Sequence, residues 1–359
     1  MKKILIGICG IGNGHLNRQI CVINELKSKG FEVLAATSID KVSVIKKKCN
    51  IEVLPIIIPW IVCDKNGVNF KDTLEKYCLS TQDRFKNFLE FSIAVEKYFN
   101  GKPDLVITDY EPNVAEYAYA SNLKLITMEQ QSKFLYLENI EINDFSINEE
   151  INRINYFFPK YDMKIISSFF PINIKKNNVV VVPPIINELE KRNKEDNKVL
   201  VYFSSYSFSI KYFEILNTIK EFNDSKFIVY TKENIDIFKK YLNYHNIKFV
   251  NFNDSFKNDL LSSAFLITTS GHQLLSEAIS IDLPIITIPL DTYEQNYNAL
   301  MIEKYKLGMK CKDFTYEVLK EFLENRFYFI NNIRDFKNKY YKNNWQEIVI
   351  EKVSSVIDE

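Results

Sequence analysis

The residues best placed to do chemistry stand near the start of the chain, where a histidine directly follows a glycine-rich turn. This segment reads Gly10-Ile11-Gly12-Asn13-Gly14-His15. Glycines at alternate positions let the backbone turn sharply and approach a ligand closely. The chain has only three histidines, and an imidazole can take up a proton near neutral pH. His15 therefore lies where a ligand held by the turn would meet a titratable base.

Two regular elements must position this turn. The apolar run Ile4–Cys9 predicts a buried strand before it. After it, apolar residues recur at helical spacing up to Lys29, and Gly30 supplies a stop; these residues are Leu16, Ile20, Ile23 and Leu26. The expected unit is a strand, a turn and a helix whose free N–H groups face the turn, which favours an anionic ligand.

A second polar cluster follows the strand expected at Phe265–Thr268. It opens a helix expected over Leu274–Ser280 and consists of Thr269, Ser270, Gly271, His272 and Gln273. Backbone N–H groups at a helix start bind phosphates, and the carboxylate of Glu277 can accept ribose hydroxyls. Glu294 and Gln295, after a strand ending near Leu290, can hydrogen-bond sugar hydroxyls. This chemistry fits a nucleoside diphosphate sugar.

Short apolar strands alternate with helical patterns along the chain, which is typical of parallel α/β architecture. We expect two doubly wound, Rossmann-like domains facing a central cleft, since such sheets bind ligands beyond the carboxyl ends of their strands. The expected divisions are residues 1–186, a polar linker at 187–198, residues 199–330, and a C-terminal helix at 331–359 that packs back on the first domain.

Composition narrows the class of protein. Lys+Arg 46 balances Asp+Glu 46, so no basic field favours nucleic acid. The six cysteines form no C-x-x-C pair, so neither a metal cage nor a disulfide framework is expected. No apolar run reaches membrane-spanning length, and we expect a cytoplasmic protein. The apolar segment from Leu54 to Val62 leaves peripheral contact with the inner face of the membrane open.

Two blocks of sequence resemble the GT-B glycosyltransferases. Within this family, the chain most resembles the branch that contains the lipid-linked N-acetylglucosaminyltransferase of peptidoglycan synthesis and the soluble UDP-dependent glycosyltransferases. The blocks are Gly10-x-Gly12-x-Gly14-His15 at the start and, far downstream, Ser270-Gly271-His272, Ser276-Glu277-Ala278, Pro284, Pro289-Leu290 and Glu294-Gln295-x-x-Asn298-Ala299. Their order and separation match the family.

The resemblance implies an inverting transfer of a sugar from a nucleoside diphosphate donor, best a UDP-sugar, to an acceptor hydroxyl, with no metal ion and no cofactor beyond the nucleotide sugar. By position, His15 is the general base, and Asp109 holds its imidazole, with Glu111 as the fallback. Residues Gly12, Asn13 and Gly14 form the loop for the acceptor or a phosphate. The chain departs from the family at Leu274, where relatives often have a hydroxyl residue, and at Thr269, where many have a histidine.

Two alternatives to a glycosyltransferase stay open, and a third is disfavoured by the sequence. A nucleotide-sugar 2-epimerase or hydrolase uses the same fold, and Leu274 is compatible with a nucleotide-sugar-binding protein that has lost turnover. A Rossmann dehydrogenase needs an acidic residue at the end of the second strand, but the nearest acid, Asp40, falls late. The sequence does not specify the acceptor (a lipid carrier, glycan, protein or small molecule), the donor base and sugar, or the oligomeric state.

Overall fold

The computed structural model of the 359-residue chain divides it into two compact units. The described residues are 1–56, 62–64, 67–69, 81–137, 145–187, 192, 195–203, 210–231, 234–290 and 292–359. The first unit comprises Met1–Val62, Phe70–Asn187 and Asn343–Glu359; the second comprises Cys63–Asn69 and Glu188–Lys342.

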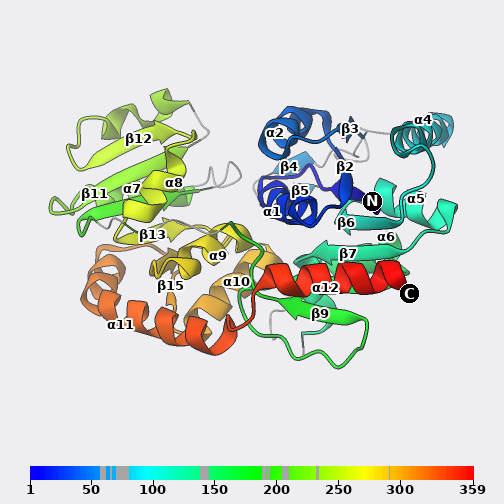
Figure 1. The fold of residues 1–359 in the computed structure, drawn as a ribbon. Coiled ribbons are helices and arrows are strands. Elements are labelled where there is room, and N and C mark those ends of the chain that lie inside the picture. The colour runs from blue at the N-terminus through cyan, green and yellow to red at the C-terminus, as the bar shows by residue number, and fades with distance from the viewer. Residues whose placement is uncertain are drawn as a thin grey trace. The chain divides into compact units, whose positions relative to one another are not determined.

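A seven-stranded parallel sheet forms the centre of the first unit, in the order β3-β2-β1-β6-β7-β8-β9 (Figure 1). The strands are β1 Lys3–Ile8, β2 Glu32–Thr37, β3 Val53–Pro55, β6 Leu105–Asp109, β7 Leu125–Glu129, β8 Met163–Ser167 and β9 Val179–Val182. Every residue of β6 and β7 is buried, as a parallel sheet with both faces covered requires.

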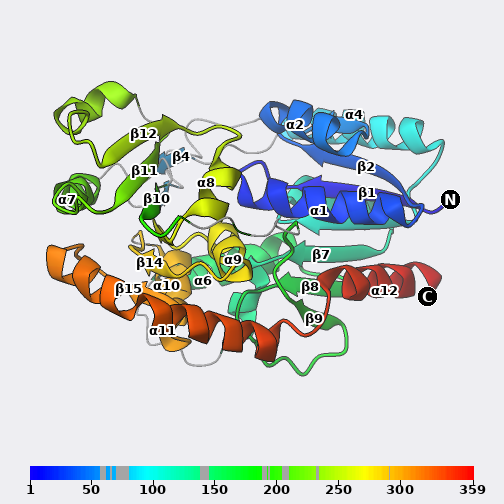
Figure 2. The same cartoon turned by 60° about the vertical axis from the view of Figure 1, so that its left-hand side comes forward.

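Helices cover both faces of this sheet. They are α1 Gly14–Ser28, α2 Ile39–Cys49, α4 Thr81–Phe99, α5 Pro112–Ser121, η1 Gln131–Leu135, α6 Phe145–Phe157 and α12 Trp345–Asp358. Because side chains alternate along a strand, Ile4 and Ile6 join the core beneath α1, α2 and α12, whereas Leu5 joins the core beneath α4, α5 and α6. The sheet thus has two separate apolar layers, and Figure 2 shows α1 and α12 over one face of it.

The second unit is built on a six-stranded parallel sheet in the order β12-β11-β10-β13-β14-β15. Its strands are β10 Lys198–Tyr202, β11 Lys226–Thr231, β12 Ile247–Asn251, β13 Phe265–Thr268, β14 Ile285–Thr287 and β15 Gly308–Lys310. Its helices are α7 Ile210–Ile219, η3 Ile235–Tyr241, α8 Phe256–Ser262, α9 His272–Ser280, α10 Tyr293–Lys304 and α11 Tyr316–Tyr340. A separate two-stranded sheet pairs β4 Val62–Asp64 with β5 Gly67–Asn69.

Both large sheets reverse their strand order next to their first strand, which is the doubly wound arrangement. The α/β class with two doubly wound sheets, expected from the sequence, is therefore confirmed. In each sheet the reversal creates a crevice position at the carboxyl ends of two adjacent strands. These strands are β1 and β6 in the first unit and β10 and β13 in the second.

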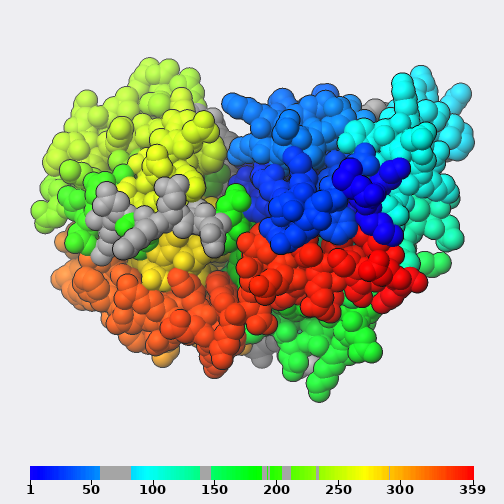
Figure 3. Space-filling model, viewed as in Figure 1, coloured from blue at the N-terminus to red at the C-terminus, as the bar shows by residue number. Residues whose placement is uncertain are grey.

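The C-terminal segment differs from expectation. Residues 331–359 do not form one helix, because α11 continues to Tyr340 and α12 starts anew at Trp345. Burial of Ile333 and Phe336 keeps the end of α11 in the second unit. The α12 helix packs on the first unit: its surface lies against the chain start in Figure 3, and the Trp345 indole N–H donates to the carbonyl of Ile186 at 3.2 Å.

One other sequence expectation falls partly outside the described chain. In the apolar segment Leu54–Val62, Ile56 is buried, while residues 57–61 lie outside the described residues. Within the part of the chain that is described, no helix combines the length and apolarity needed to cross a membrane.

Candidate active site

The glycine turn lies between β1 and α1, at the crevice position of the first unit. Gly12 has a φ of 70°, a left-handed conformation that glycine adopts without strain. Helix α1 begins at Gly14, so His15 stands in its first turn. Strands β1 and β6 pair in parallel with Ile8 opposite Asp109. The start of α1 and the end of β6 therefore meet at one edge of the sheet.

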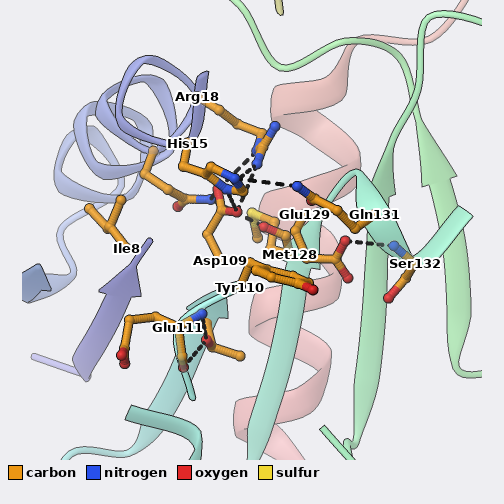
Figure 4. Close-up of polar contacts among 12 residues, drawn as sticks. Ile8, His15, Arg18, Asp109, Tyr110, Glu111, Met128, Glu129, Gln131 and Ser132 are labelled. Carbon is orange, nitrogen blue, oxygen red and sulfur yellow. Dashed lines mark hydrogen bonds and ion pairs between the residues drawn. The ribbon is translucent and has the colours of Figure 1, made fainter. Parts of the chain in front are cut away.

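His15 and Asp109 are in direct contact there. Nδ1 of His15 lies 2.6 Å from Oδ1 of Asp109 (Figure 4). The Asp109 side chain is fully buried, and 13% of the His15 side chain is exposed. An ionised carboxylate can only accept hydrogen bonds, so Nδ1 of His15 carries the proton. In the neutral ring, Nε2 is then the nitrogen with a free lone pair.

Arg18 and Gln19, which the sequence analysis did not single out, complete the surroundings of Asp109. Arg18 donates from Nε to Oδ2 at 2.9 Å and from Nη2 to Oδ1 at 2.7 Å. Gln19 donates from Nε2 to Oδ2 at 2.9 Å. Burial by itself would raise the pKa of the Asp109 carboxyl, but the charges of Arg18 and His15 outweigh it and lower the pKa to about 2. Asp109 is thus held as a carboxylate.

The other ring nitrogen of His15 faces the segment after β7. Nε2 of Gln131 lies 3.3 Å from Nε2 of His15. The ring of Tyr110 lies beside the imidazole, with centroids 6.2 Å apart. Tyr110 has a φ of 56°, a strained conformation for a tyrosine, and its hydroxyl donates to Glu150 at 2.6 Å.

Glu111, the fallback partner of His15, has a different role. Its carboxylate accepts hydrogen bonds from the backbone N–H groups of Asn113 and Val114, at 3.2 and 2.7 Å, and so caps α5. Burial raises the pKa of the Glu111 carboxyl to about 7, with these hydrogen bonds acting in the opposite direction. The fallback assignment is therefore wrong, because Glu111 is committed to its own helix.

In the second unit, the loop between β13 and α9 carries the other polar cluster. Thr269, Ser270 and His272 are buried, and the Oγ of Ser270 has no hydrogen-bond partner among the described residues. Gly271 is the N-cap residue of α9, with an ordinary φ of −66°. A Cβ added at Gly271 would meet no atom within 4 Å. The loop therefore leaves space directly in front of the N-terminus of α9.

Side chains of α10 and α9 hold this loop. The Oε1 of Gln295 accepts from the backbone N–H groups of Ser270 at 3.2 Å and Leu290 at 3.1 Å. Asn298 donates to the carbonyl of Ser270 at 2.9 Å. One turn into α9, Gln273 donates to Glu277 at 3.1 Å, and burial raises the pKa of the Glu277 carboxyl. Glu294 stands in the first turn of α10.

Comparison with protein families decides the class of the protein. The family described as Glycosyl transferase family 1 matches residues 2–326. This span includes the turn that carries His15 and the loop before α9. The chain belongs to this family. It is a glycosyltransferase.

Solved structures share the fold of this glycosyltransferase over nearly its whole length. The UDP-glucose: anthocyanidin 3-O-glucosyltransferase in complex with UDP is 14% identical, with 99% of each chain covered and a TM-score of 0.76. A UDP-glucosyltransferase from Polygonum tinctorium capable of glucosylating indoxyl is 15% identical, with 100% of this chain and 99% of that one covered and a TM-score of 0.74. The spinosyn forosaminyltransferase is 12% identical, with both chains fully covered and a TM-score of 0.70. The search among curated proteins found no match.

The structure of the glycosyltransferase brings most of the sequence-predicted residues together within each unit. His15 and Asp109 touch next to the Gly12–Gly14 turn. Residues 269–273 form one loop and helix start, which Gln295 contacts. Sequence reasoning missed Arg18, although a residue three positions after His15 shares its helix face. It also missed Gln19 and Gln131, and it named Asn298 in the second block without giving it a role. In the described part of the chain, no group of three or more His, Cys, Asp or Glu side chains could hold a metal ion.

Proposed function

We propose that the protein transfers a sugar from a nucleoside diphosphate sugar to an acceptor hydroxyl, with inversion at the anomeric carbon. The observation that carries the proposal is the pair formed by His15 and Asp109, 2.6 Å apart, which in the neutral ring makes Nε2 of His15 the nitrogen that can accept a proton. A UDP-sugar is the proposed donor, because two solved structures of the same fold are named for UDP-glucosyl transfer.

His15 acts as the general base in this reaction. The acceptor hydroxyl gives its proton to Nε2 of His15, and its oxygen forms the new bond to the anomeric carbon. The bond from that carbon to the diphosphate oxygen breaks at the same time, and the diphosphate leaves with the electron pair. Attack on the face opposite the leaving group inverts the configuration. Asp109 stabilises the imidazolium that forms.

The start of α9 binds the leaving diphosphate. Its first N–H groups have no partner within the helix, and the helix dipole favours negative charge at this end. Ser270 offers a buried hydroxyl beside these groups, and Gly271 leaves room for the phosphates. Glu277 binds the ribose, and Glu294 and Gln295 lie near the sugar. We propose that these groups replace a metal ion, so that transfer proceeds in EDTA.

Turnover of defined donors tests the proposal. The full-length protein is incubated in EDTA with UDP-, dTDP-, GDP- and CDP-sugars, with and without a panel of hydroxyl compounds. We expect a glycoside of inverted configuration and one equivalent of released UDP, only when an acceptor is present. Release of free sugar at the same rate without acceptor would indicate a hydrolase instead, and an epimerised donor would indicate an epimerase. If the protein bound a nucleotide but formed no product, the proposed enzymatic activity would be contradicted.

A further inference from the structure

Gln131 occupies a fixed position at the carboxyl end of the first sheet. It is the first residue of η1, two residues after β7 ends, and it is 8% exposed. The residues on either side of it are hydrogen-bonded. The N–H of Ser132 donates to the side chain of Glu129 at 2.7 Å, and the side chain of Lys133 donates to the side chain of Gln130 at 2.6 Å. The amide of Gln131 therefore extends from a hydrogen-bonded turn.

The two ends of this amide have different surroundings. Nε2 of Gln131 lies 3.3 Å from Nε2 of His15 (Figure 4). Since Asp109 fixes the His15 proton on Nδ1, the amide is the donor and the imidazole the acceptor in this contact. Oε1 of Gln131 is buried and has no hydrogen-bond partner among the described residues. Such a buried, unpaired carbonyl is uncommon and calls for an explanation.

An acceptor hydroxyl must compete with Gln131 for His15. The lone pair of Nε2 lies in the ring plane and takes one well-aligned donor. When an acceptor hydroxyl donates to it, the Gln131 amide loses its hydrogen bond to His15, and neither end of this buried amide then has a partner among the described residues. Unpaired buried polar groups weaken a complex unless the ligand itself pairs with them.

Several donor groups near His15 already have partners. Arg18 and Gln19 donate to Asp109, and the hydroxyl of Tyr110 donates to Glu150. Among the described residues, Gln131 contacts Nε2 of His15 and has both a donor and an acceptor to offer a ligand.

We infer that Gln131 positions the acceptor and selects compounds with a second hydroxyl next to the reacting one. The reacting hydroxyl donates to Nε2 of His15. The adjacent hydroxyl donates to Oε1 of Gln131 and accepts from its Nε2, so that both ends of the amide are paired. The acceptor class is therefore a vicinal diol or a catechol. This inference rests on the proposed function, since it takes His15 as the base.

Matched acceptor pairs test the inference. The pairs are catechol and phenol, 1,2-cyclohexanediol and cyclohexanol, and a sugar with its deoxy analogue, each with UDP-glucose. We expect kcat/KM of the wild type to favour the diol of a pair by about tenfold or more. In Gln131→Met, which keeps the side-chain length, the preference falls to about twofold or less through a slower reaction of the diol. Gln82→Met, at an exposed glutamine of α4, is the matched control and keeps the preference.

A second measurement needs no acceptor. In the free protein, the ¹⁵N signal of His15 Nε2 should shift in Gln131→Met but not in Gln82→Met, because the amide hydrogen bond is lost. Should Gln131→Met fail to fold, Gln131→Asn replaces it, since its shorter amide cannot reach His15 in the same way.

Three results would overturn the inference: equal rates for both members of each pair, a diol preference that survives in Gln131→Met, or an unshifted His15 signal. A separate variant distinguishes failure of the proposed function. If His15→Ala transfers sugar like the wild type, the base assignment fails. If His15→Ala is inactive and Gln131→Met keeps the diol preference, only the role of Gln131 fails.

Discussion

At the scale of single residues, the charge on Asp109 is the property on which the first site depends. Four donor atoms reach its carboxylate, from His15, Arg18 and Gln19. A buried carboxylate without such partners would take up a proton and could no longer orient the imidazole. Arg18 balances this charge, and the carboxylate accepts the proton-bearing Nδ1 of His15.

The lowered pKa of Asp109 makes stability depend on pH. Its pKa falls from an ordinary 3.8 to about 2 on folding, so the unfolded chain binds the proton more tightly. The stabilisation is complete above pH 4 and is lost as the pH falls through 2, an effect of about 2 kcal/mol. We expect the difference in unfolding free energy between wild type and Asp109→Asn, measured in urea at several pH values, to shrink below pH 4. A difference that stays constant down to pH 2 would contradict this.

Only some of the residues of this site could be predicted from the sequence. His15 was predictable because a glycine turn after a strand is a local pattern, and Asp109 because it ends a strand. Gln131 lies 116 positions from His15, and only the parallel order of β1, β6 and β7 brings it near. Arg18 had a signal in its helical spacing from His15, but its contact with Asp109 could be found only from the pairing of β1 and β6.

At the scale of elements, the loop before α9 leaves open space in front of the helix N-terminus. Gln295 and Asn298 hold the backbone of Ser270 from α10. The adjacent Gly271 has neither a strained backbone nor a neighbour that would exclude a side chain. The fold therefore does not require glycine at position 271, and the open space beside Gly271 can hold a ligand.

Gly271→Val separates binding from folding. The fold accommodates the added atoms, so we expect thermal unfolding to show a loss of about 1 kcal/mol or less, from the poorer N-cap. The same atoms fill the space proposed for the diphosphate. The dissociation constant for UDP, measured by calorimetry, should rise at least tenfold, with a smaller rise for Gly271→Ala. Wild-type UDP affinity in stable Gly271→Val would place the diphosphate elsewhere.

The elements themselves were largely predictable. The two strands whose bounds were predicted, Ile4–Cys9 and Phe265–Thr268, lie within one residue of β1 and β13 at each end. Strands β3 and β15 were missed because three residues, one of them Pro55 in β3, are too few to show a period. The break between α11 and α12 was missed because both helices bury apolar residues at helical spacing, and the turn at residues 341–344 contains no glycine or proline.

At the scale of the whole molecule, one strand order is used twice, and in our proposal each copy supplies a different half of the chemistry. The first unit supplies the base and its carboxylate partner, and the second supplies the open helix start. Solved glycosyltransferases with 12–15% identity share this fold. Two short blocks of sequence were enough to predict the family, which matches residues 2–326.

The transfer rate of His15→Ala tests the central claim most directly. It is measured with the full-length protein beside His245→Ala, a matched control at an exposed histidine of the second unit. We predict that His15→Ala lowers kcat at least about 100-fold, with unchanged thermal stability and UDP affinity, while His245→Ala retains the wild-type rate. A kcat for His15→Ala within a few-fold of the wild type would contradict the assignment of His15 as the base.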